Sequence, residues 1–297
     1  MSLPATAVRS DREPFEPKDW GLFLAVSFIW GASFLFIDIA LDAFHPGLIT
    51  WIRVGLGALS LAVLPAARVR FEAGDRKKVL LLSVVWVGVP FTLFPLAQQY
   101  INSAVTGMLN GAMPIFAAII GGLFFGRPSR GPQRIGLLIG FGGIALVSLA
   151  SGAEGDNAFI GVAMVLFATL CYGLATNLAG PIQQKYGSVP VMARMLAFAT
   201  IWTMPFGLFG LADSTFGWAA AASNIVLGVA GTGLAFVLMA TLVGRVGGPR
   251  ASFITYLIPV VSLALGVGFR NDRVTAISLV GVILVIAGAA LASRREA

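Results

Sequence analysis

Apolar residues occur along the chain in long runs separated by short segments rich in charged residues, glycine and proline. A helix needs roughly 20 apolar residues to span the hydrocarbon core of a bilayer. The pattern therefore predicts ten transmembrane helices, which we place at residues 21–41, 46–66, 79–99, 104–124, 134–151, 159–180, 189–210, 223–243, 250–269 and 274–292. The first run exceeds the roughly 7 to 15 apolar residues of a signal-peptide core, so we expect it to remain as the first span.

The composition indicates that lipid surrounds most of this chain. Of the 297 residues, 58% are hydrophobic and 11% are charged, and the mean hydropathy is +0.90. Ordinary soluble domains carry roughly 25% charged residues. Because the ten spans and their short connections take up nearly the whole length, no soluble domain fits beside them. The predicted fold class is an all-α integral membrane protein with ten transmembrane helices.

Basic residues lie between the apolar runs and at the chain ends. They share no common face, so the net charge of +7 does not indicate a nucleic-acid partner. Alternate connections, together with both ends of the chain, hold 16 of the 20 Lys and Arg residues. By the positive-inside rule this set is cytoplasmic. We therefore expect a multi-pass protein of the plasma (inner) membrane, with residues 1–20 and 293–297 as cytoplasmic tails.

The two halves of the chain repeat each other. Three residues of the first half have counterparts 145 positions later in the chain. Pro114, Arg127 and Gly136 correspond to Pro259, Asp272 and Gly281, respectively. The sequence thus predicts two repeats of five helices, at 21–151 and 152–292. Because five is odd, the second repeat is inverted in the membrane. Inverted repeats around a midplane site are the architecture of alternating access.

The same residues carry a resemblance to a known family. They are the segment Trp30-Gly31-Ala32-Ser33-Phe34, Arg53 in the second span, and the Pro114 and Pro259 helices, each followed by a glycine-rich helix. In this order they resemble the EamA family of the drug/metabolite transporter superfamily, from about Gly21 to Ala292. The resemblance implies a secondary transporter that exports amino acids or related metabolites.

Polar and aromatic side chains inside the spans are the candidates for binding substrate, because in a membrane such groups face protein or water. Asn110 and Tyr256 precede the two prolines by four and three residues, and Trp30 and Tyr172 share the other repeated position. For each, the alternative is plain packing or a hydrogen bond between helices. The predicted substrate-binding set is Trp30, Gln98, Tyr100, Asn110, Tyr172, Asn177 and Tyr256.

Charges inside spans are costly, about 2.5 to 3.5 kcal/mol at a helix centre on insertion scales, which makes Asp38 and Arg53 functional candidates. We expect them to form a charge pair or gate on the outer side, or to contact a zwitterion. The alternative is a structural ion pair, or an Asp38 side chain that reaches the interface. Pro114 and Pro259 each remove a backbone donor from a helix and are predicted hinges.

The motif content narrows the class of function. The chain contains no Walker A motif, and His45 is its only histidine, so neither ATP nor a metal or other cofactor is expected. No span holds an acid at its middle, which favours a carrier driven by the substrate gradient, while Asp38 keeps proton coupling open.

The leading hypothesis is a secondary exporter of amino acids, aromatic or otherwise amphipathic, or of related small metabolites. The alternatives are a carrier of nucleotide sugars, lipids or drug-like compounds and, in a different class, an intramembrane enzyme. We expect no enzyme, because a nucleophile, a base and an orienting group do not occur together. The expected partners are a small-molecule substrate and the lipid bilayer. A monomer suffices for transport, and the oligomeric state is left open.

Overall fold

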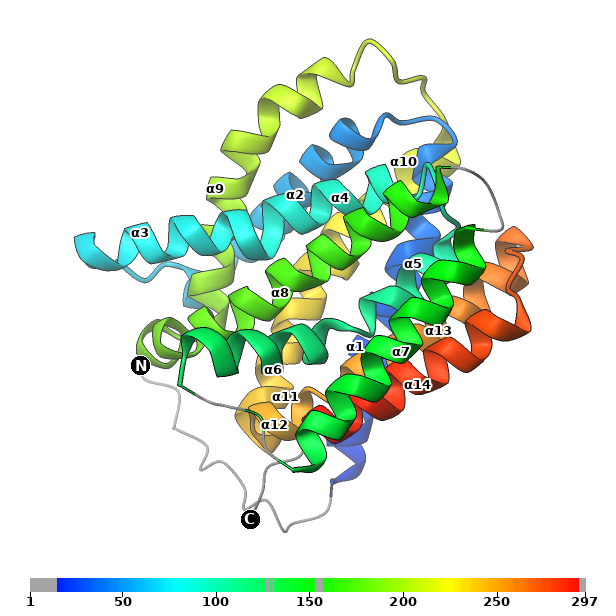
Figure 1. Cartoon of the computed structure of the whole chain (residues 1–297). Coiled ribbons are helices and arrows are strands. Elements are labelled where there is room, and N and C mark those ends of the chain that lie inside the picture. The colour runs from blue at the N-terminus through cyan, green and yellow to red at the C-terminus, as the bar shows by residue number, and fades with distance from the viewer. Residues whose placement is uncertain (1–14, 127–128, 130, 153–156, 294–297) are drawn as a thin grey trace.

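The computed structural model describes residues 15–126, 129, 131–152 and 157–293, and every regular element among them is a helix (Figure 1). Arg127 of the repeat and most of both predicted tails, residues 1–14 and 294–297, lie outside the described residues. The α-helices are α1 (Pro17–Leu41), α2 (Pro46–Ala62), α3 (Ala73–Leu82), α4 (Val89–Ala97), α5 (Ser103–Asn110), α6 (Met113–Phe124), α7 (Pro132–Gly152), α8 (Ala158–Tyr186), α9 (Ser188–Phe209), α10 (Trp218–Gly228), α11 (Ala235–Val246), α12 (Gly248–Ala251), α13 (Ile254–Leu265) and α14 (Ala276–Ala292).

Several of these helices join into stretches of membrane-spanning length. In the described part of the chain, seven stretches are long and apolar enough to cross a membrane: Pro17–Leu41, Ala73–Ala97, Ser103–Phe124, Pro132–Ala150, Ala158–Tyr186, Ser188–Phe209 and Trp218–Val246. The shorter apolar helices Pro46–Ala62, Ile254–Arg270 and Ala276–Ala292 lie where the other three spans are predicted. For the described residues, the predicted all-α fold with multiple apolar helices is confirmed. Ten spans and their inverted arrangement remain predictions.

The first helix begins inside the predicted N-terminal tail. Pro17 lies in the first turn of α1, where its missing N–H group would have no helical partner anyway. Glu16 and Asp19 form a capping box there, and the buried Asp19 pairs with Arg245 at the end of α11. Helix α1 therefore begins at Pro17, before residue 20 where the tail was predicted to end. The extent of the cytoplasmic tail remains a prediction.

Two of the long stretches contain a π-helical segment at nearly the same place in each half. The segment η2 (Ser83–Gly88) joins α3 to α4, and η3 (Val229–Leu234) joins α10 to α11. In η3 the hydroxyl of Thr232 donates to the Leu227 carbonyl five residues earlier, at 2.9 Å. Such segments are rare and occur frequently at functional sites. A short 3₁₀ turn η1 (Pro65–Ala67) and a third π segment η4 (Gly266–Arg270) complete the described elements.

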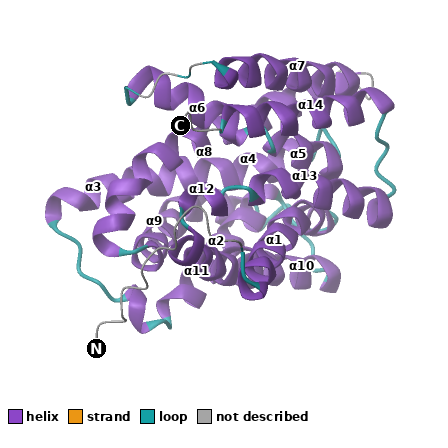
Figure 2. Ribbon diagram, turned by 90° about the horizontal axis from the view of Figure 1, so that it is seen from below, coloured by secondary structure: helices purple, strands orange, loops and turns teal. Residues whose placement is uncertain are grey.

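Helices α7 and α14 lie side by side along one edge of the bundle, as Figure 1 and Figure 2 both show. Glycines bring their backbones together. A Cβ built on Gly143 would lie 2.6 Å from the Gly281 carbonyl oxygen, and one on Gly136 would lie 2.6 Å from the Gly288 carbonyl oxygen. Small residues permit this close approach between membrane helices.

The two proline-containing helical stretches are held by glycines of their neighbours. A Cβ on Gly31 of α1 would lie 2.5 Å from Cβ of Val261 in α13. Similarly, a Cβ on Gly173 of α8 would lie 2.9 Å from the carbonyl carbon of Phe116 in α6. Helix α1 therefore packs on α13, which contains Pro259, about as closely as α8 packs on α6, which contains Pro114.

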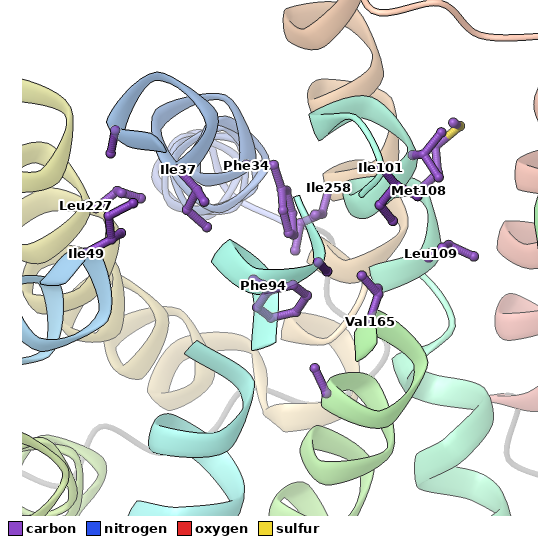
Figure 3. Close-up of a cluster of buried hydrophobic side chains, with 14 of the residues drawn as sticks. Phe34, Ile37, Ile49, Phe94, Ile101, Met108, Leu109, Val165, Leu227 and Ile258 are labelled. Atoms are coloured by element: carbon purple, nitrogen blue, oxygen red, sulfur yellow. The ribbon is translucent and has the colours of Figure 1, made fainter. Parts of the chain in front are cut away.

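Apolar side chains from several helices fill the centre of the bundle, and Figure 3 shows a part of this core. Phe34 and Ile37 of α1 lie beside Phe94 of α4, and all three are buried. The rings of Phe34 and Phe94 meet edge to face with centroids 5.4 Å apart. This cluster closes one end of the cavity described next.

Candidate functional site

A cavity of about 410 Å³ lies within the bundle, between α1, α2, α4, α8, α9, α11 and α13. Phe34 and Phe94, which are buried, line one end of the cavity, and Val243 and Gly248 line the other end. Gly248 is exposed, and it lies next to the end of α11, which pairs with the start of α1. The cavity therefore opens where α1 begins, which we call the open side. The opposite end of the bundle, where α1 ends, is the closed side.

Four of the predicted site residues line this cavity: Trp30, Arg53, Asn110 and Tyr172. Trp30 packs against Phe236 with ring centroids 5.8 Å apart, and Tyr172 packs against Phe94 at 5.9 Å. Asn110 is buried, and no described group hydrogen-bonds its Oδ1 atom. The cavity can therefore offer aromatic faces and an amide group to a ligand. That these residues bind substrate remains a prediction.

Arg53 is the charged residue of the cavity lining and is only 6% exposed. Its Nε atom donates to Oγ1 of Thr232 at 3.3 Å, and its guanidinium carbon lies 4.0 Å from the centroid of the Phe91 ring. Thr232 belongs to the π-helical segment η3, whose irregular backbone turns this hydroxyl toward α2. Among the described residues, Arg53 has no carboxylate partner.

The predicted ion pair between Asp38 and Arg53 is not formed. Asp38 pairs with Nε of Arg270 at the end of η4, and the same guanidinium binds Asp42 through both terminal nitrogens at 2.8 and 2.9 Å. Asp38 lies one helical turn beyond Phe34 on α1, so it projects past the aromatic cluster, while Arg53 projects into the cavity. The pair of Asp38 and Arg270 joins α1 to η4 across the closed side. We call this pair, with Asp42, the ionic latch.

A second hollow of about 440 Å³ lies on the closed side, and we call it the vestibule. Asp38, Asp42, Asp213 and Gln98 contribute to its lining. Gln98 is buried, and neither side-chain amide atom has a hydrogen-bond partner among the described residues. The predicted site residue Gln98 therefore belongs to the vestibule and not to the cavity with Trp30.

Three residues of the predicted substrate-binding set lie outside both hollows. Tyr100 is 40% exposed at the end of α4, beyond Gln98. The amide of Asn177 donates to the carbonyls of Ala117 and Gly173, both at 2.9 Å. The hydroxyl of Tyr256 donates to the Ala289 carbonyl at 3.1 Å. Asn177 and Tyr256 thus make the helix-to-helix hydrogen bonds that were their alternative role.

The two prolines lie at different places in their helices. Pro114 is in the first turn of α6, just after the chain leaves α5 at Gly111 and Ala112, whereas Pro259 lies inside α13. Their stretches touch, because a Cβ on Gly111 would lie 2.8 Å from Cγ of Pro259. The chain is therefore interrupted just before Pro114, whereas α13 continues through Pro259, and the action of the two prolines as hinges remains a prediction.

Sequence reasoning missed several residues that shape the cavity and its closed end. Trp86 and Phe91 line the cavity, and Arg270 closes the latch. Nothing in a single sequence separates Trp86 or Phe91 from an aromatic residue that faces lipid. Arg270 did carry a signal, because it and Arg273 are the two basic residues in the set of connections that otherwise holds acidic residues.

Apolar helices around a cavity that opens at one end are the features of a multi-pass membrane transporter. The chain belongs to the EamA-like transporter family, whose model matches residues 20–149 and 159–294. Residues 20–149 and 159–294 correspond closely to the two predicted halves.

Curated relatives cover nearly the whole chain at low identity. The chain is 24% identical over 281 residues to a protein of Streptantibioticus cattleyicolor named "Probable terminal-alkyne amino-acid exporter", with 93% of each protein covered. It is 23% identical over 286 residues to the "Probable amino-acid metabolite efflux pump" of Escherichia coli, with 91% of this chain and 93% of that protein covered. An "Uncharacterized transporter" of Archaeoglobus fulgidus is 23% identical over 279 residues, covering 94% of this chain and all of that protein.

The fold also has a counterpart among solved structures. A crystal structure superposes with a TM-score of 0.61 at 15% sequence identity, and the match covers 92% of this chain and 96% of that chain. At this identity the likeness supports the fold. Family membership and the names of the relatives indicate a transporter and not an enzyme.

Proposed function

We propose that this protein is a secondary exporter of amino acids or related amphipathic metabolites, and that it works by alternating access of two inverted five-helix repeats. The observation that carries the proposal is the one-ended cavity. Its polar and aromatic lining is reachable from the open side, while Phe34, Ile37 and Phe94 seal it toward the closed side. A carrier needs a site that faces one compartment at a time.

Helix contacts support the inverted repeats. Under the offset of 145, Gly136 corresponds to Gly281 and Gly143 to Gly288. The contacts that are formed join Gly136 to Gly288 and Gly143 to Gly281. Exchanging the two halves therefore converts each contact into the other, as a two-fold relation requires. The π segments η2 and η3 begin at Ser83 and Val229, 146 residues apart, and agree with the same relation.

The charges at the two ends support the orientation that we propose. The open side carries basic residues of connections, including Arg245 and Arg250 at the ends of α11 and α12. The closed side carries the acidic vestibule with Asp42 and Asp213. By the positive-inside rule the open side is cytoplasmic, as are both chain termini, and the membrane is the plasma (inner) membrane. The cavity then receives its substrate from the cytoplasm, as an exporter requires.

The proposed substrate class follows from the relatives and the lining. Two relatives are named as exporters of amino acids or their metabolites. The cavity volume of about 410 Å³ is at the lower end of the range of ligand pockets, roughly 300 to 1,000 Å³. Aromatic residues such as Trp30, Trp86 and Tyr172 line it, and such rings suit an apolar or aromatic side chain.

Counterflow in proteoliposomes tests this function. Purified protein is reconstituted, the vesicles are loaded with one unlabelled amino acid, and uptake of labelled amino acids is followed with and without a pH gradient. We expect protein-dependent exchange for an aromatic or other amphipathic member, without any need for a pH gradient. Exchange no faster than in protein-free vesicles across the whole panel would refute the proposal.

A further inference from the structure

We infer that the cavity selects organic anions, and that its preferred cargo is an apolar monocarboxylate whose carboxylate binds Arg53. This inference rests on the proposed transport function and names the charge of the substrate. It goes beyond the amino-acid class, because a zwitterion and an anion place different demands on the cavity. Two observations carry it: the unused donors of Arg53 and the charge balance of the lining.

The guanidinium of Arg53 has hydrogen-bond donors that could bind an anionic ligand. It has five N–H donors in a planar fork that matches a carboxylate. One of them, on Nε, donates to Thr232, and among the described residues the two terminal nitrogens have no acceptor. A cation that is 6% exposed inside the bundle is stabilised by its contact with Phe91 but is not neutralised by it. A bound carboxylate would supply the missing charge and two acceptors.

The charge balance of the cavity offers an ammonium group no carboxylate partner among the described residues. Arg53 is the charged side chain among the described residues that line it, and these residues include no Asp or Glu. The nearest acid along α1 is Asp38, which lies on the far side of the Phe34 cluster and is held by Arg270. A zwitterion would therefore bury its ammonium group without a carboxylate. An amine would in addition be repelled by Arg53.

The rest of the lining fits the apolar body of such an anion. Aromatic side chains around Arg53 come from four different elements, namely Trp30, Trp86, Phe91 and Tyr172. Asn110 adds a buried amide whose Oδ1 atom has no described partner, so it can accept a hydrogen bond from a donor on the ligand, but it carries no negative charge to balance an ammonium group. One carboxylate with an aromatic or aliphatic body therefore balances the charge of Arg53 and fills the apolar part of the lining, and it leaves no second charge without a partner.

Arg194 provides a matched control. It occupies the position equivalent to Arg53 in the second half, at an offset of 141 residues, but it is exposed on α9 and does not line the cavity. The contrast between the two arginines isolates the effect of placing this charge in the cavity. Arg194→Gln changes the net charge of the protein by the same amount as Arg53→Gln.

The test measures binding of three ligands that share a phenyl group and a two-carbon chain: 3-phenylpropionate, phenylalanine and 2-phenylethylamine. Isothermal titration of the purified full chain in detergent gives their affinities at pH 7.5. We expect 3-phenylpropionate to bind about 10-fold or more tightly than phenylalanine, and the amine to bind weakest. In Arg53→Gln the preference for 3-phenylpropionate should disappear, whereas Arg53→Lys should keep the order and Arg194→Gln should leave all three affinities within about 2-fold.

Phenylalanine binding as tightly as 3-phenylpropionate, or a preference that survives in Arg53→Gln, would overturn the inference. If Arg53→Gln does not fold, the order of the three affinities in the unmodified protein and in Arg53→Lys tests the inference. Proteoliposome exchange of 2-phenylethanesulfonate, which stays anionic and does not leak as a neutral acid, separates this inference from the proposed function. Anion-selective binding without any exchange would refute transport and leave the selectivity standing.

Discussion

Breaking the ionic latch should open the closed side of the carrier, and Arg270→Gln does this with one substitution. The side chains of Arg270 and Asp38 are 31% and 18% exposed, whereas Asp42 is 55% exposed. An exposed ion pair contributes a few tenths of a kcal/mol after solvent screening, and a half-buried, hydrogen-bonded pair contributes more. The latch as a whole therefore stabilises the closed state by about 1 to 2 kcal/mol, which changes the population ratio roughly 5- to 30-fold.

A cysteine reporter can measure this change, because Cys171 is the single cysteine of the chain and is buried. In a Cys171→Ala background, Ser33→Cys places a thiol in the cavity lining, behind the Phe34 cluster as seen from the closed side. A membrane-impermeant thiol reagent is then added to the closed side of oriented vesicles. We expect Arg270→Gln to raise the labelling rate roughly 5- to 30-fold, and Asp42→Asn to raise it less, because Asp42 is the more exposed partner.

Arg273→Gln is the matched control for this experiment. Arg273 lies three residues from Arg270 and has the same charge, but its side chain forms no ion pair with any described residue. Its labelling rate should stay within about 2-fold of the background protein. Equal rates for Arg270→Gln and Arg273→Gln would refute the view that the latch holds the closed side.

Two further predictions test the helix contacts and the cavity assignment. Gly143→Ala should destabilise the protein by about 1 to 3 kcal/mol, because the added Cβ would lie 2.6 Å from backbone of Gly281. Gly142→Ala, with open space around its Cβ, should be neutral or slightly stabilising; equal thermal unfolding of the two variants in detergent would contradict the α7 to α14 contact. Asn110→Ala should slow substrate exchange and leave the melting temperature unchanged. Asn177→Ala, in contrast, should lower the melting temperature and leave substrate affinity unchanged. The reverse pattern would show that Asn110 lies outside the substrate site.

The helical architecture could be predicted because it follows from run lengths of apolar residues. Each predicted span overlaps a helix or helical stretch of the structure. The start of α1 was missed, because Lys18 and Asp19 make the sequence polar there, while the burial of Asp19 depends on Arg245, more than 220 residues away. Pairings of this kind depend on the arrangement of helices, and one sequence does not contain them.

The candidate site was predictable only in part, for a similar reason. Spacing and residue type indicated that Trp30, Arg53, Asn110 and Tyr172 matter, and all four line the cavity. The same criteria could not tell on which face of its helix a polar group lies. Tyr256 occupies nearly the same repeat position as Asn110, yet its hydroxyl binds the backbone of α14. Symmetry of the two halves predicts position along a helix better than it predicts the direction of a side chain.

The seal between the cavity and the vestibule is thin, and this has an electrical consequence. Phe34 lines one hollow and Asp38, four residues later, lines the other, so about 6 Å of helix separates them. When water fills both hollows, most of the membrane voltage falls across this short distance. A potential of 100 mV acts on one elementary charge with about 2.3 kcal/mol. In the proposed orientation, with a negative cytoplasm at the open side, the voltage itself drives the proposed anionic substrate outward through the seal, without a coupled proton.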